Sequence, residues 1–594
     1  MFGHVDAGVL HVRPALNLKD PTHASLIRTI SDEVARLTMK YGGVLWGEHG
    51  KGIRSEYAPT YFGPLYAALQ EIKAAFDPHN QLNPGKIATP AGREARLLHI
   101  DEVSLRADSD RQIDERVWQS YESAVHCNGN GACYNFDPND AMCPSWKATR
   151  ERKHSPKGRA SLLREWLRLQ GNAGVDVLQV AERQKSFLAG LPARWRNSHQ
   201  RRTHPDEAPE DFSLEVYDAM AACLACKSCA GQCPVKVNVP DFRSRFLELY
   251  HTRYLRPIKD YFIGSLEFSI PYLARAPWLY NKTMSSALTR RLLDRYAGLV
   301  DSPLLSRVNL KSQLKHWGVR KATPASLKAL TDSERSKSVI LVQDAFTRYF
   351  DAQVFAAFIE LAARLGYTVW LAPFMPNGKP LHVLGFLRAF HKTARKSAAM
   401  LGELGSYGVP LVGLDPAMTL VYRQEYAKLP SLTHPPTVLL PQEWLVRVLP
   451  EARPGSPTGH FQLLNHCTEK TTAPTAAALW PEVFARVGLT LKAQASGCCG
   501  MSGTYGHESR NVTTSRQIYS QSWEPILKAG QMEFLATGYS CRSQVKRMEK
   551  QELRHPVQVL LELFSRDQAA ADVSADGGRQ AGPPFPLGGL VADR

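Results

Sequence analysis

Four cysteines followed by a proline form the clearest chemical pattern in this 594-residue sequence. They are Cys223, Cys226, Cys229 and Cys233, and the proline is Pro234. Spacings of two, two and three intervening residues are typical of iron–sulfur proteins, in which three thiolates on a tight loop hold three corners of a [4Fe–4S] cube. The run therefore predicts at least one [4Fe–4S] cluster. Structural zinc is the alternative, although zinc sites usually pair two separated C-x2-C units.

The fourth cysteine of such a run ligates a second cluster, and a partner run lies upstream. Cys127 and Cys133 match its first and third positions, Cys143 precedes a proline as the fourth does, and Asn130 replaces the second cysteine. A complete [4Fe–4S] cluster would take the thiols of Cys143, Cys223, Cys226 and Cys229. The other thiols, those of Cys127, Cys133 and Cys233, would leave one iron of a second cluster without a thiolate. That site could hold a [3Fe–4S] cluster, a [4Fe–4S] cluster completed by Asn130 or His126, or nothing.

The last four of the eleven cysteines fall in the second of two similar α/β units, predicted for residues 338–416 and 461–541. Each unit begins and ends with an apolar strand and has a third strand between helical stretches. The expected strands are 338–343, 367–372 and 409–414 in the first unit, and 461–465, 489–493 and 533–537 in the second. This alternation implies a parallel sheet that helices cover on both faces.

A cysteine follows each strand of the second unit. These residues are Cys467, the adjacent Cys498 and Cys499, and Cys541. Loops at the carboxyl ends of parallel strands converge, so the four thiols should meet. They could bind a cluster or zinc, form a redox-active thiol pair, or remain unligated. Neighbouring cysteines rarely close a strain-free disulfide, so the Cys498–Cys499 pair favours a metal.

Two histidines near the N-terminus suggest a different metal site. If Ala7-Gly8 is a two-residue hairpin turn, His4 lies opposite His11 with the Cβ atoms ~5 Å apart, close enough to share one divalent ion. Glu48 could supply a third ligand, and two histidines with one glutamate and an open position are typical of catalytic zinc. Exposed or core histidines without a metal are the alternative.

Several motifs resemble FAD-linked D-2-hydroxyacid dehydrogenases of the D-2-hydroxyglutarate and D-lactate dehydrogenase type, in the vanillyl-alcohol-oxidase flavoprotein superfamily. The resemblance rests on FGHVDAGVLH at 2–11, GGVLWGEHGKG at 42–52 and FDPHNQLNPGK at 76–86. HCNGNGACYNF at 126–136, HSPKGRA at 154–160 and the cysteine run resemble the bacterial fusion form, which adds a ferredoxin-like 4Fe-4S module and a cysteine-rich CCG module. The resemblance covers roughly residues 1 to 565.

The resemblance implies roles for individual residues. The metal ligands, for Zn²⁺ or a similar divalent ion, fall on His4, His11 and Glu48. His49 corresponds to the catalytic base, Arg13 to a substrate-binding position, and Asn83 to the turn where the family's chain returns toward the flavin.

The implied function is FAD- and Fe–S-dependent oxidation of a D-2-hydroxyacid to the 2-oxoacid. D-2-hydroxyglutarate is the first candidate substrate and D-lactate the second, and the electrons would pass through a 4Fe-4S cluster to a quinone or an electron-transfer protein. The alternative is a non-catalytic iron–sulfur subunit of a complex like glycolate oxidase or heterodisulfide reductase. Because the family's FAD-binding half precedes the first motif, we expect an N-terminally truncated form or a separate flavin chain, with little activity from this chain alone.

The fold expected is a multidomain α+β and α/β protein. The expected segments are the C-terminal part of a FAD-linked oxidase domain at 1–95, a helical ferredoxin-like module at 115–250, a helical connector at 251–335, a degenerate CCG-like repeat at 336–450, a cysteine-rich CCG-like repeat at 451–565, and a disordered tail at 566–594. An odd number of clustered cysteines argues against a disulfide framework.

Charge and composition bear on partners. The net charge is +17, with 73 Lys+Arg against 56 Asp+Glu. Residues 147–202 are strongly basic and contain a predicted amphipathic helix at 161–170; a solvated face is the simplest interpretation, and an anionic docking patch is the alternative. No recognition motif accompanies the charge, so nucleic acid is not expected as a partner.

The region 250–300 is rich in aromatic residues and arginine, which suits either packing between modules or contact with a membrane surface. No apolar run reaches the 18 residues of a membrane span, and the N-terminus lacks a signal peptide. We therefore expect a cytoplasmic protein, with peripheral contact at the cytoplasmic membrane face as the alternative. The sequence does not define the oligomeric state.

Overall fold

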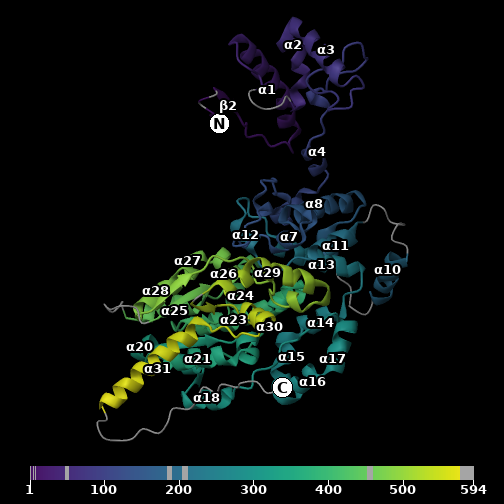
Figure 1. Cartoon of the computed structure of the whole chain (residues 1–594). Helices are drawn as coiled ribbons and strands as arrows, with labels where there is room; N and C mark the ends of the chain where they lie inside the picture. Colours follow the sequence, from purple (N-terminus) through teal and green to yellow (C-terminus); the bar gives the residue numbers. More distant parts are fainter. Residues whose placement is uncertain are drawn as a thin grey trace. The chain divides into compact units, whose positions relative to one another are not determined.

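The computed structural model describes residues 2–4, 6, 8–46, 52–182, 190–203, 212–450, 459–530 and 532–575 (Figure 1). The chain divides into two compact units. The first comprises residues 1–120 and 167–176, and the second comprises residues 121–166 and 177–594. Each unit is described by itself.

The first unit is mainly helical. Its elements are β1 (Phe2–His4), β2 (Val9–His11), α1 (Pro21–Lys40), η2 (Gly52–Tyr57), α2 (Ala58–Phe62), η3 (Gly63–Leu65), α3 (Tyr66–Phe76), η4 (Ile100–Glu102), α4 (Arg106–Asp110) and α5 (Glu115–Ser120). The long helix α1 begins where the Asp20 carboxylate accepts the Thr22 N–H and Pro21 takes the first helical position. Both features stabilise a helix N-terminus, because they satisfy or remove donors that have no partner within the helix.

The hairpin of β1 and β2 is antiparallel, but its predicted register is wrong. His4 lies opposite Val9 and Phe2 opposite His11, a shift of two residues from the expected pairing of His4 with His11. The connection is longer than two residues, and Gly8 in it has a φ of 62°. A shift of two keeps a side chain on the same face, so His4 and His11 remain diagonal neighbours.

The N-terminal part of the second unit is helical. Its elements are α6 (Glu122–Val125), η5 (Ala132–Tyr134), α7 (Pro144–Thr149), η6 (Arg152–His154), α8 (Pro156–Asn172), α9 (Val177–Glu182), α10 (Leu191–Thr203), α11 (Ser213–Ala221), α12 (Ser228–Gln232) and α13 (Val239–Arg253). The end of α8, from residue 167, belongs to the first unit. The predicted amphipathic helix is part of α8, in which Leu163, Trp166 and Leu167 are buried.

A helical connector follows. It contains α14 (Ile258–Gly264), α15 (Leu266–Leu273), α16 (Pro277–Ser285), α17 (Ala287–Leu292), η8 (Leu293–Ala297) and α18 (Leu310–His316). Figure 1 shows α14 to α17 gathered together within this unit. Among the described residues, none of the helices combines the length and apolar character needed to cross a bilayer.

All the predicted strands are present in the two α/β units. The first sheet contains β4 (Ser338–Val342), β5 (Thr368–Leu371) and β6 (Leu411–Gly413), and the second contains β8 (His460–Leu464), β9 (Thr490–Ala493) and β10 (Glu533–Ala536). The first sheet also has two short strands that the sequence analysis did not predict, β3 (Arg320–Lys321), within the stretch expected to be a helical connector, and β7 (Val438–Leu439). Every pairing within these two sheets is parallel. β4 lies between β5 and β6, and β8 lies between β9 and β10. In both sheets the first of the three predicted strands therefore lies between the other two, and the pairing is parallel as expected.

Helices flank both sheets. They are α19 (Pro324–Lys328), α20 (Asp332–Ser336), η9 (Phe346–Phe350), α21 (Ala352–Arg364), α22 (Lys379–Val383), α23 (Leu387–Gly405), α24 (Pro416–Gln424), η10 (Tyr426–Lys428), α25 (Pro441–Val448), α26 (Cys467–Thr472), α27 (Pro474–Ala477), α28 (Leu479–Arg486), η11 (Tyr505–His507), η12 (Ser509–Asn511), α29 (Val512–Ala529), α30 (Tyr539–Glu549) and α31 (Pro556–Ala575). One apolar core includes Leu341 of the first repeat and Leu463 and Leu535 of the second, so the repeats fold against each other.

The last helix, α31, packs against α21 of the first repeat. It continues to Ala575, beyond residue 566 where the disordered tail was expected to begin. The segment from Gln568 to Ala571 is rich in alanine, which has the highest helix propensity. Residues 576–594 lie outside the described ranges.

A buried carboxylate joins the helical connector to the first repeat. Glu267 of α15 is almost fully buried and accepts backbone N–H groups from Asn377 at 3.2 Å and Gly378 at 2.8 Å. Burial raises the pKa of Glu267 to about 7, although the two N–H groups favour the ionised form. The connector is therefore held to the loop after β5 by a group that titrates near neutral pH.

We predict that Glu267→Gln reduces the pH dependence of stability. Because the folded-state pKa lies above the ordinary value of 4.5, the folded protein retains a proton that the unfolded chain releases, and stability falls as pH rises from about 4.5 to 7. A pKa shift of this size corresponds to a loss of roughly 3 kcal/mol in the free energy of unfolding. Thermal melting of the unchanged protein and of Glu267→Gln between pH 5 and 8 should show a smaller loss of stability with rising pH for the variant. Glu482→Gln, at an exposed ion pair with Arg486, is the control; equal slopes for all three proteins would contradict the prediction.

Candidate functional site

Four thiols from two separate segments of the sequence line one cavity of the second unit. The cavity has about 310 Å³ of empty space, part of it open to solvent. Its cysteines are Cys143, Cys223, Cys226 and Cys229. Arg159 and Lys227 also line it. The sequence grouped the same four thiols from their spacing alone.

The loop before α12 turns sharply around these thiols. Ala225 and Lys227 have φ values of 56° and 63°, in the left-handed region that L-residues rarely adopt. The Ala225 N–H points to the sulfur of Cys223 at 3.4 Å. The Lys227 ammonium contacts the Glu425 carboxylate at 2.5 Å and the Gln424 side chain at 2.6 Å, both from the first repeat. These buried polar contacts hold the strained loop in place.

Arg159 provides a buried positive charge beside the thiols. Its guanidinium is fully buried and donates to the carbonyl of Ala219 at 2.7 Å, to the carbonyl of His154, and to the hydroxyl of Ser145 at 3.1 Å. One nitrogen also lies 3.9 Å from the sulfur of Cys143. The HSPKGRA motif contains this arginine, but sequence reasoning assigned it no role.

The thiols of this cavity favour a group that carries positive charge. The neighbouring Cys467 thiol together with burial raises the pKa of Cys226, and burial raises the pKa of Cys223 and Cys229. Thiolates in such surroundings require positive charge close by, which iron and the Arg159 guanidinium could supply. The donor set and the nearby cation therefore fit a [4Fe–4S] cluster.

The upstream cysteines lie near the same cavity. Burial raises the pKa of Cys133, and Cys143 and Cys127 add smaller electrostatic contributions. Cys233 is buried at the end of α12. The Asn130 side-chain oxygen accepts the Ala132 N–H at 2.9 Å, so the residue at the missing cysteine position also stabilises its own loop. His126 is exposed.

The four C-terminal thiols come together, and a fifth joins them. Cys467 and Cys498 pack in one buried cluster with Cys226 against it, and Cys499 and Cys541 pack in a second cluster that begins at the adjacent residue. The convergence of the last four follows from parallel-sheet geometry. The link from Cys226 to Cys467 has no signal in the sequence, because it depends on how the helical module packs on the second repeat.

Cys226 can lie next to Cys467 because the backbones of two helices approach each other closely. Helix α12 packs against α26, and a Cβ atom added at Gly231 would lie 2.0 Å from the carbonyl oxygen of Thr471. Two hydroxyl groups of the second repeat donate to carbonyls of the cysteine loop, from Thr468 to Cys226 at 3.2 Å and from Ser502 to Leu224 at 2.7 Å. Glycine is therefore required between Cys229 and Cys233.

We predict that Gly231→Ala destabilises the second unit by roughly 1–3 kcal/mol, because the new methyl group overlaps a backbone oxygen that cannot move freely. Gly402→Ala is the control. It lies within α23, nothing is within 4 Å of its added Cβ, and alanine should stabilise that helix by about 0.5–1 kcal/mol. Denaturant unfolding measures both effects; equal stability for the two variants would show that the approach of α12 to α26 is not tight.

A second, larger cavity adjoins the four-thiol cavity. It has about 990 Å³ of empty space, and Cys223 and Leu224 line both cavities. Its other walls include Ile263 and Leu266 of the connector and Met418 of the first repeat. Apolar side chains make up much of the lining, which also includes the charged residues Arg243, Lys379, Asp415 and Glu508, and such a mixture is common in small-molecule sites. Sequence analysis did not predict this cavity.

His466 lies where the larger cavity meets the second repeat. Its Nδ1 accepts the Thr468 N–H at 3.2 Å, and its Nε2 lies 3.4 Å from the hydroxyl of Ser540. Burial lowers the pKa of His466 to about 4, so the ring is neutral near pH 7. With Nδ1 accepting, the proton is on Nε2, directed at Ser540.

In the first unit, the rings of His4 and His11 lie edge to face with centroids 5.3 Å apart. Two imidazoles on one tetrahedral zinc, with Zn–N bonds of ~2.0 Å, would place their ring centres about 5 Å apart. The pair therefore fits two ligands of a divalent ion.

The other two residues predicted for this site, Glu48 and His49, lie outside the described residues. Within the described ranges, no three His, Cys, Asp or Glu side chains are grouped as around a single ion. This does not bear on the four-thiol cavity, because the thiols around a four-iron cube lie farther apart than the ligands of a single ion.

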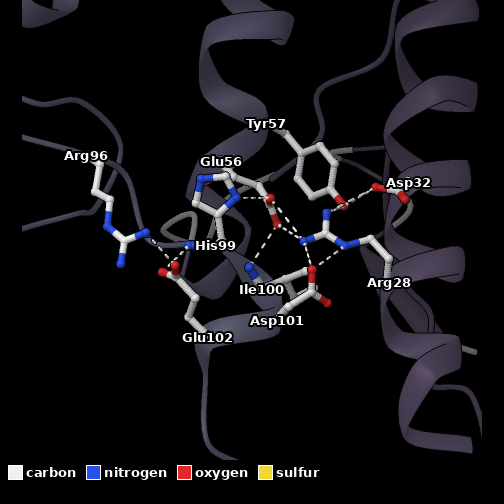
Figure 2. A network of polar contacts seen from close by, with 9 residues as sticks. All are labelled: Arg28, Asp32, Glu56, Tyr57, Arg96, His99, Ile100, Asp101 and Glu102. Atoms are coloured by element: carbon white, nitrogen blue, oxygen red, sulfur yellow. Dashed lines mark hydrogen bonds and ion pairs between the residues drawn. The ribbon is translucent and has the colours of Figure 1, made fainter.

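A polar network fixes the segment that follows Glu48 and His49 in the chain (Figure 2). Arg28 of α1 contacts Asp101 at 2.6 Å and Glu56 of η2 at 3.0 Å. Glu56 also accepts the Ile100 N–H at 2.9 Å and pairs with His99 at 3.0 Å. The hydrogen bond to Asp101 is the main cause that raises the pKa of Arg28. The sequence analysis did not predict a role for the largely buried Glu56, because no motif marks this residue.

The other two predicted residues lie on exposed turns. Asn83 has a φ of 47°, and its carbonyl accepts the Lys86 N–H at 3.1 Å. Lys86 and Ile87 then contact η2, through the Gly52 carbonyl at 3.1 Å and the Ser55 hydroxyl at 3.1 Å. Arg13 follows β2 and is exposed. The structure brings the Asn83 turn to η2 and shows no shared site for Asn83 and Arg13 among the described residues.

Comparison with known proteins gives a family match for the N-terminal segment. Residues 1–87 match the family model described as "FAD linked oxidases, C-terminal domain", so this domain is present where the sequence motifs predicted it. No solved structure matches the chain.

Several curated relatives match nearly the whole chain. It is 65% identical over 567 residues to D-2-hydroxyglutarate dehydrogenase of Pseudomonas putida, and 49% identical over 571 residues to the protein of that name in Escherichia coli (strain K12). Both alignments cover 95% of this chain and 56% of the relative. The chain thus spans little more than half the length of these relatives. It is also 25% identical over 197 residues to one of the subunits of anaerobic glycerol-3-phosphate dehydrogenase of Escherichia coli (strain K12), which covers 32% of this chain and 49% of that protein.

Proposed function

We propose that this chain supplies the metal-binding and electron-transfer parts of a FAD-linked D-2-hydroxyacid dehydrogenase, with D-2-hydroxyglutarate as the first candidate substrate. The names of its 65% and 49% identical relatives support the substrate, and the match of residues 1–87 supports the flavin chemistry. The observation that carries the electron-transfer part is the cavity lined by four thiols.

At the N-terminal end, His4 and His11 would hold a divalent ion together with Glu48. The chemistry that such an ion supplies, when bound, is to bind the hydroxyl and carboxylate oxygens of the substrate and lower the hydroxyl pKa. His49 would accept the hydroxyl proton, and Arg13 would contact the substrate carboxylate. The chemistry that FAD supplies, when bound, is to accept a hydride from the α-carbon of the substrate. Asn83 would lie near the FAD.

At the other end, Cys143, Cys223, Cys226 and Cys229 would hold a [4Fe–4S] cluster, which supplies one-electron transfer when bound. Arg159 balances the negative charge of the thiolates. A small acceptor such as a quinone would fit the larger cavity, because its apolar walls reach Cys223. An electron-transfer protein is the other acceptor class. The thiols of Cys467, Cys498, Cys499 and Cys541 would form an additional metal or thiol site next to Cys226.

We predict about four irons and four acid-labile sulfides per chain in anaerobically purified protein, with an electron paramagnetic resonance signal after dithionite reduction. Cys143→Ser should lose this signal, because it removes one of the four thiols that line the cavity. Cys133→Ser, a buried cysteine outside that set, is the matched control and should keep it. An unchanged signal in Cys143→Ser would contradict the grouping. Seven or more irons would indicate a second cluster.

A second prediction concerns the histidine pair. Zn²⁺ titrated into the full chain should bind at least tenfold more weakly to His4→Ala, because one of two facing imidazoles is lost. His316→Ala, an exposed histidine of α18, is the control and should bind as the unchanged chain does. Equal affinity in all three proteins would remove the histidine site from the proposal.

The non-catalytic iron–sulfur subunit stays the second candidate. The similarity to a subunit of anaerobic glycerol-3-phosphate dehydrogenase favours it, since that name denotes one component of a complex. A pure electron relay has no use for facing histidines. Four irons without zinc affinity at His4 and His11 would therefore favour this candidate, whereas both properties together favour the dehydrogenase.

A further inference from the structure

The neighbouring helices α14 to α17 and η8 of the second unit expose many large apolar side chains. We call the exposed side chains of these helices the connector face. Its exposed apolar residues are Ile258, Tyr261, Phe262, Phe268, Tyr272, Leu273, Trp278, Leu279, Leu288, Leu292 and Tyr296. Tyr272, Trp278 and Tyr296 are 66–69% exposed. Isolated exposed apolar residues are common, but so many in one short segment indicate an interaction surface.

These helices are neighbours in space. Contacts join α14 to α15 and to η8, η8 to α17, and α17 to α16. Figure 1 shows the four helices gathered together. The connector face is thus carried by one continuous group of helices.

The charged residues of the same helices are mostly basic. The exposed basic residues are Arg275, Lys282, Arg290, Arg291 and Arg295. Of the acidic residues, Asp260 and Glu267 are buried, and the exposed Asp294 accepts a hydrogen bond from Ser509 at 2.5 Å. The outward charge is therefore strongly positive.

Two of the arginines lie over aromatic rings of this face. The Arg275 guanidinium is 5.1 Å from the ring centre of Tyr272, and that of Arg295 is 5.9 Å from Tyr296. Tyrosine and tryptophan favour the headgroup region of a bilayer, and arginine and lysine attract anionic lipids. The aromatic groups of these helices therefore suit the headgroup region of a bilayer, and their basic groups suit its anionic lipids.

The inner sides of two of these helices reach the larger cavity. Ile263 of α14 and Leu266 of α15 line it, whereas Phe262 and Phe268 on the same helices are exposed. A bilayer on the connector face would therefore lie about one helix diameter, ~10 Å, from the cavity beside Cys223.

We propose that the connector face binds the surface of an anionic lipid bilayer, without any segment crossing it. The purpose of this contact rests on the proposed function: a lipid-soluble acceptor would reach the larger cavity from the bilayer. The contact itself depends only on the connector face, so it can be tested separately from the iron and zinc sites.

Charge distinguishes lipid from a second copy of this chain. Pairing two connector faces would bring five basic side chains of each copy together, with only Asp294 to offset them on each side. An anionic bilayer attracts the same charges, and the net charge of +17 adds to the attraction.

The test is sedimentation of the full chain with vesicles of phosphatidylcholine, with and without 30% phosphatidylglycerol. We expect binding to the anionic vesicles that weakens as salt increases. The double variant Arg290→Glu with Arg291→Glu should bind at least tenfold more weakly. Its control is Lys311→Glu with Lys315→Glu, which changes the net charge equally on exposed residues of α18.

The apolar contribution has its own pair of variants. Tyr272→Ser with Trp278→Ser should also reduce vesicle binding at least tenfold, whereas Trp195→Ser, an exposed tryptophan of α10, should not. All substituted residues are exposed, and far-ultraviolet circular dichroism confirms that the variants fold.

Three results would overturn the proposal. The first is no binding to anionic vesicles, and the second is equal loss in the test and control variants, which would reflect overall charge alone. The third is a dimer in light scattering that the connector-face variants abolish, which would assign the face to a second copy. None of these results alters the iron or zinc content by which the proposed function is judged.

Discussion

The contact between α12 and α26 determines how the thiol groups of this protein are arranged. Gly231 lets the two backbones approach closely, and the hydroxyl groups of Thr468 and Ser502 bind carbonyls of the cysteine loop. Cys226 thereby reaches Cys467, and the thiols of the helical module become continuous with those of the second repeat. The wall between the four-thiol cavity and the larger cavity depends on the same contact, because Leu224 belongs to the loop that it holds.

Buried charge complements this packing. Arg159 donates to the carbonyls of Ala219 and His154 and to the Ser145 hydroxyl, beside the sulfur of Cys143. Lys227 pairs with Glu425 of the first repeat. Taking such charges out of water is costly, so each needs nearly complete hydrogen bonding. Arg159 meets this requirement through its hydrogen bonds and also places a positive charge 3.9 Å from the sulfur of Cys143.

The sequence predicts features that are local and misses those that depend on tertiary contact. The strands of both repeats were predictable because short apolar runs alternate with amphipathic helices, and the grouping of Cys143 with three cysteines of the run followed from spacing. The register of the first hairpin was missed, since it depends on the length of a turn around Gly8. The link from Cys226 to Cys467 and the role of Arg159 arise from packing between distant segments. Periodicity and spacing carry no information about such contacts.

The two repeats also differ in the residues at the carboxyl ends of their strands. Where the second repeat has cysteines, the first has Asp344 and Asp415. Asp415 accepts the Met418 N–H at the start of α24 and, with its other oxygen, the Tyr539 N–H at the start of α30, two residues before Cys541. One carboxylate therefore caps a helix in each repeat. The first turns of α24 and α30 cannot separate without breaking one of its two hydrogen bonds, so a displacement of either helix is felt at the start of the other.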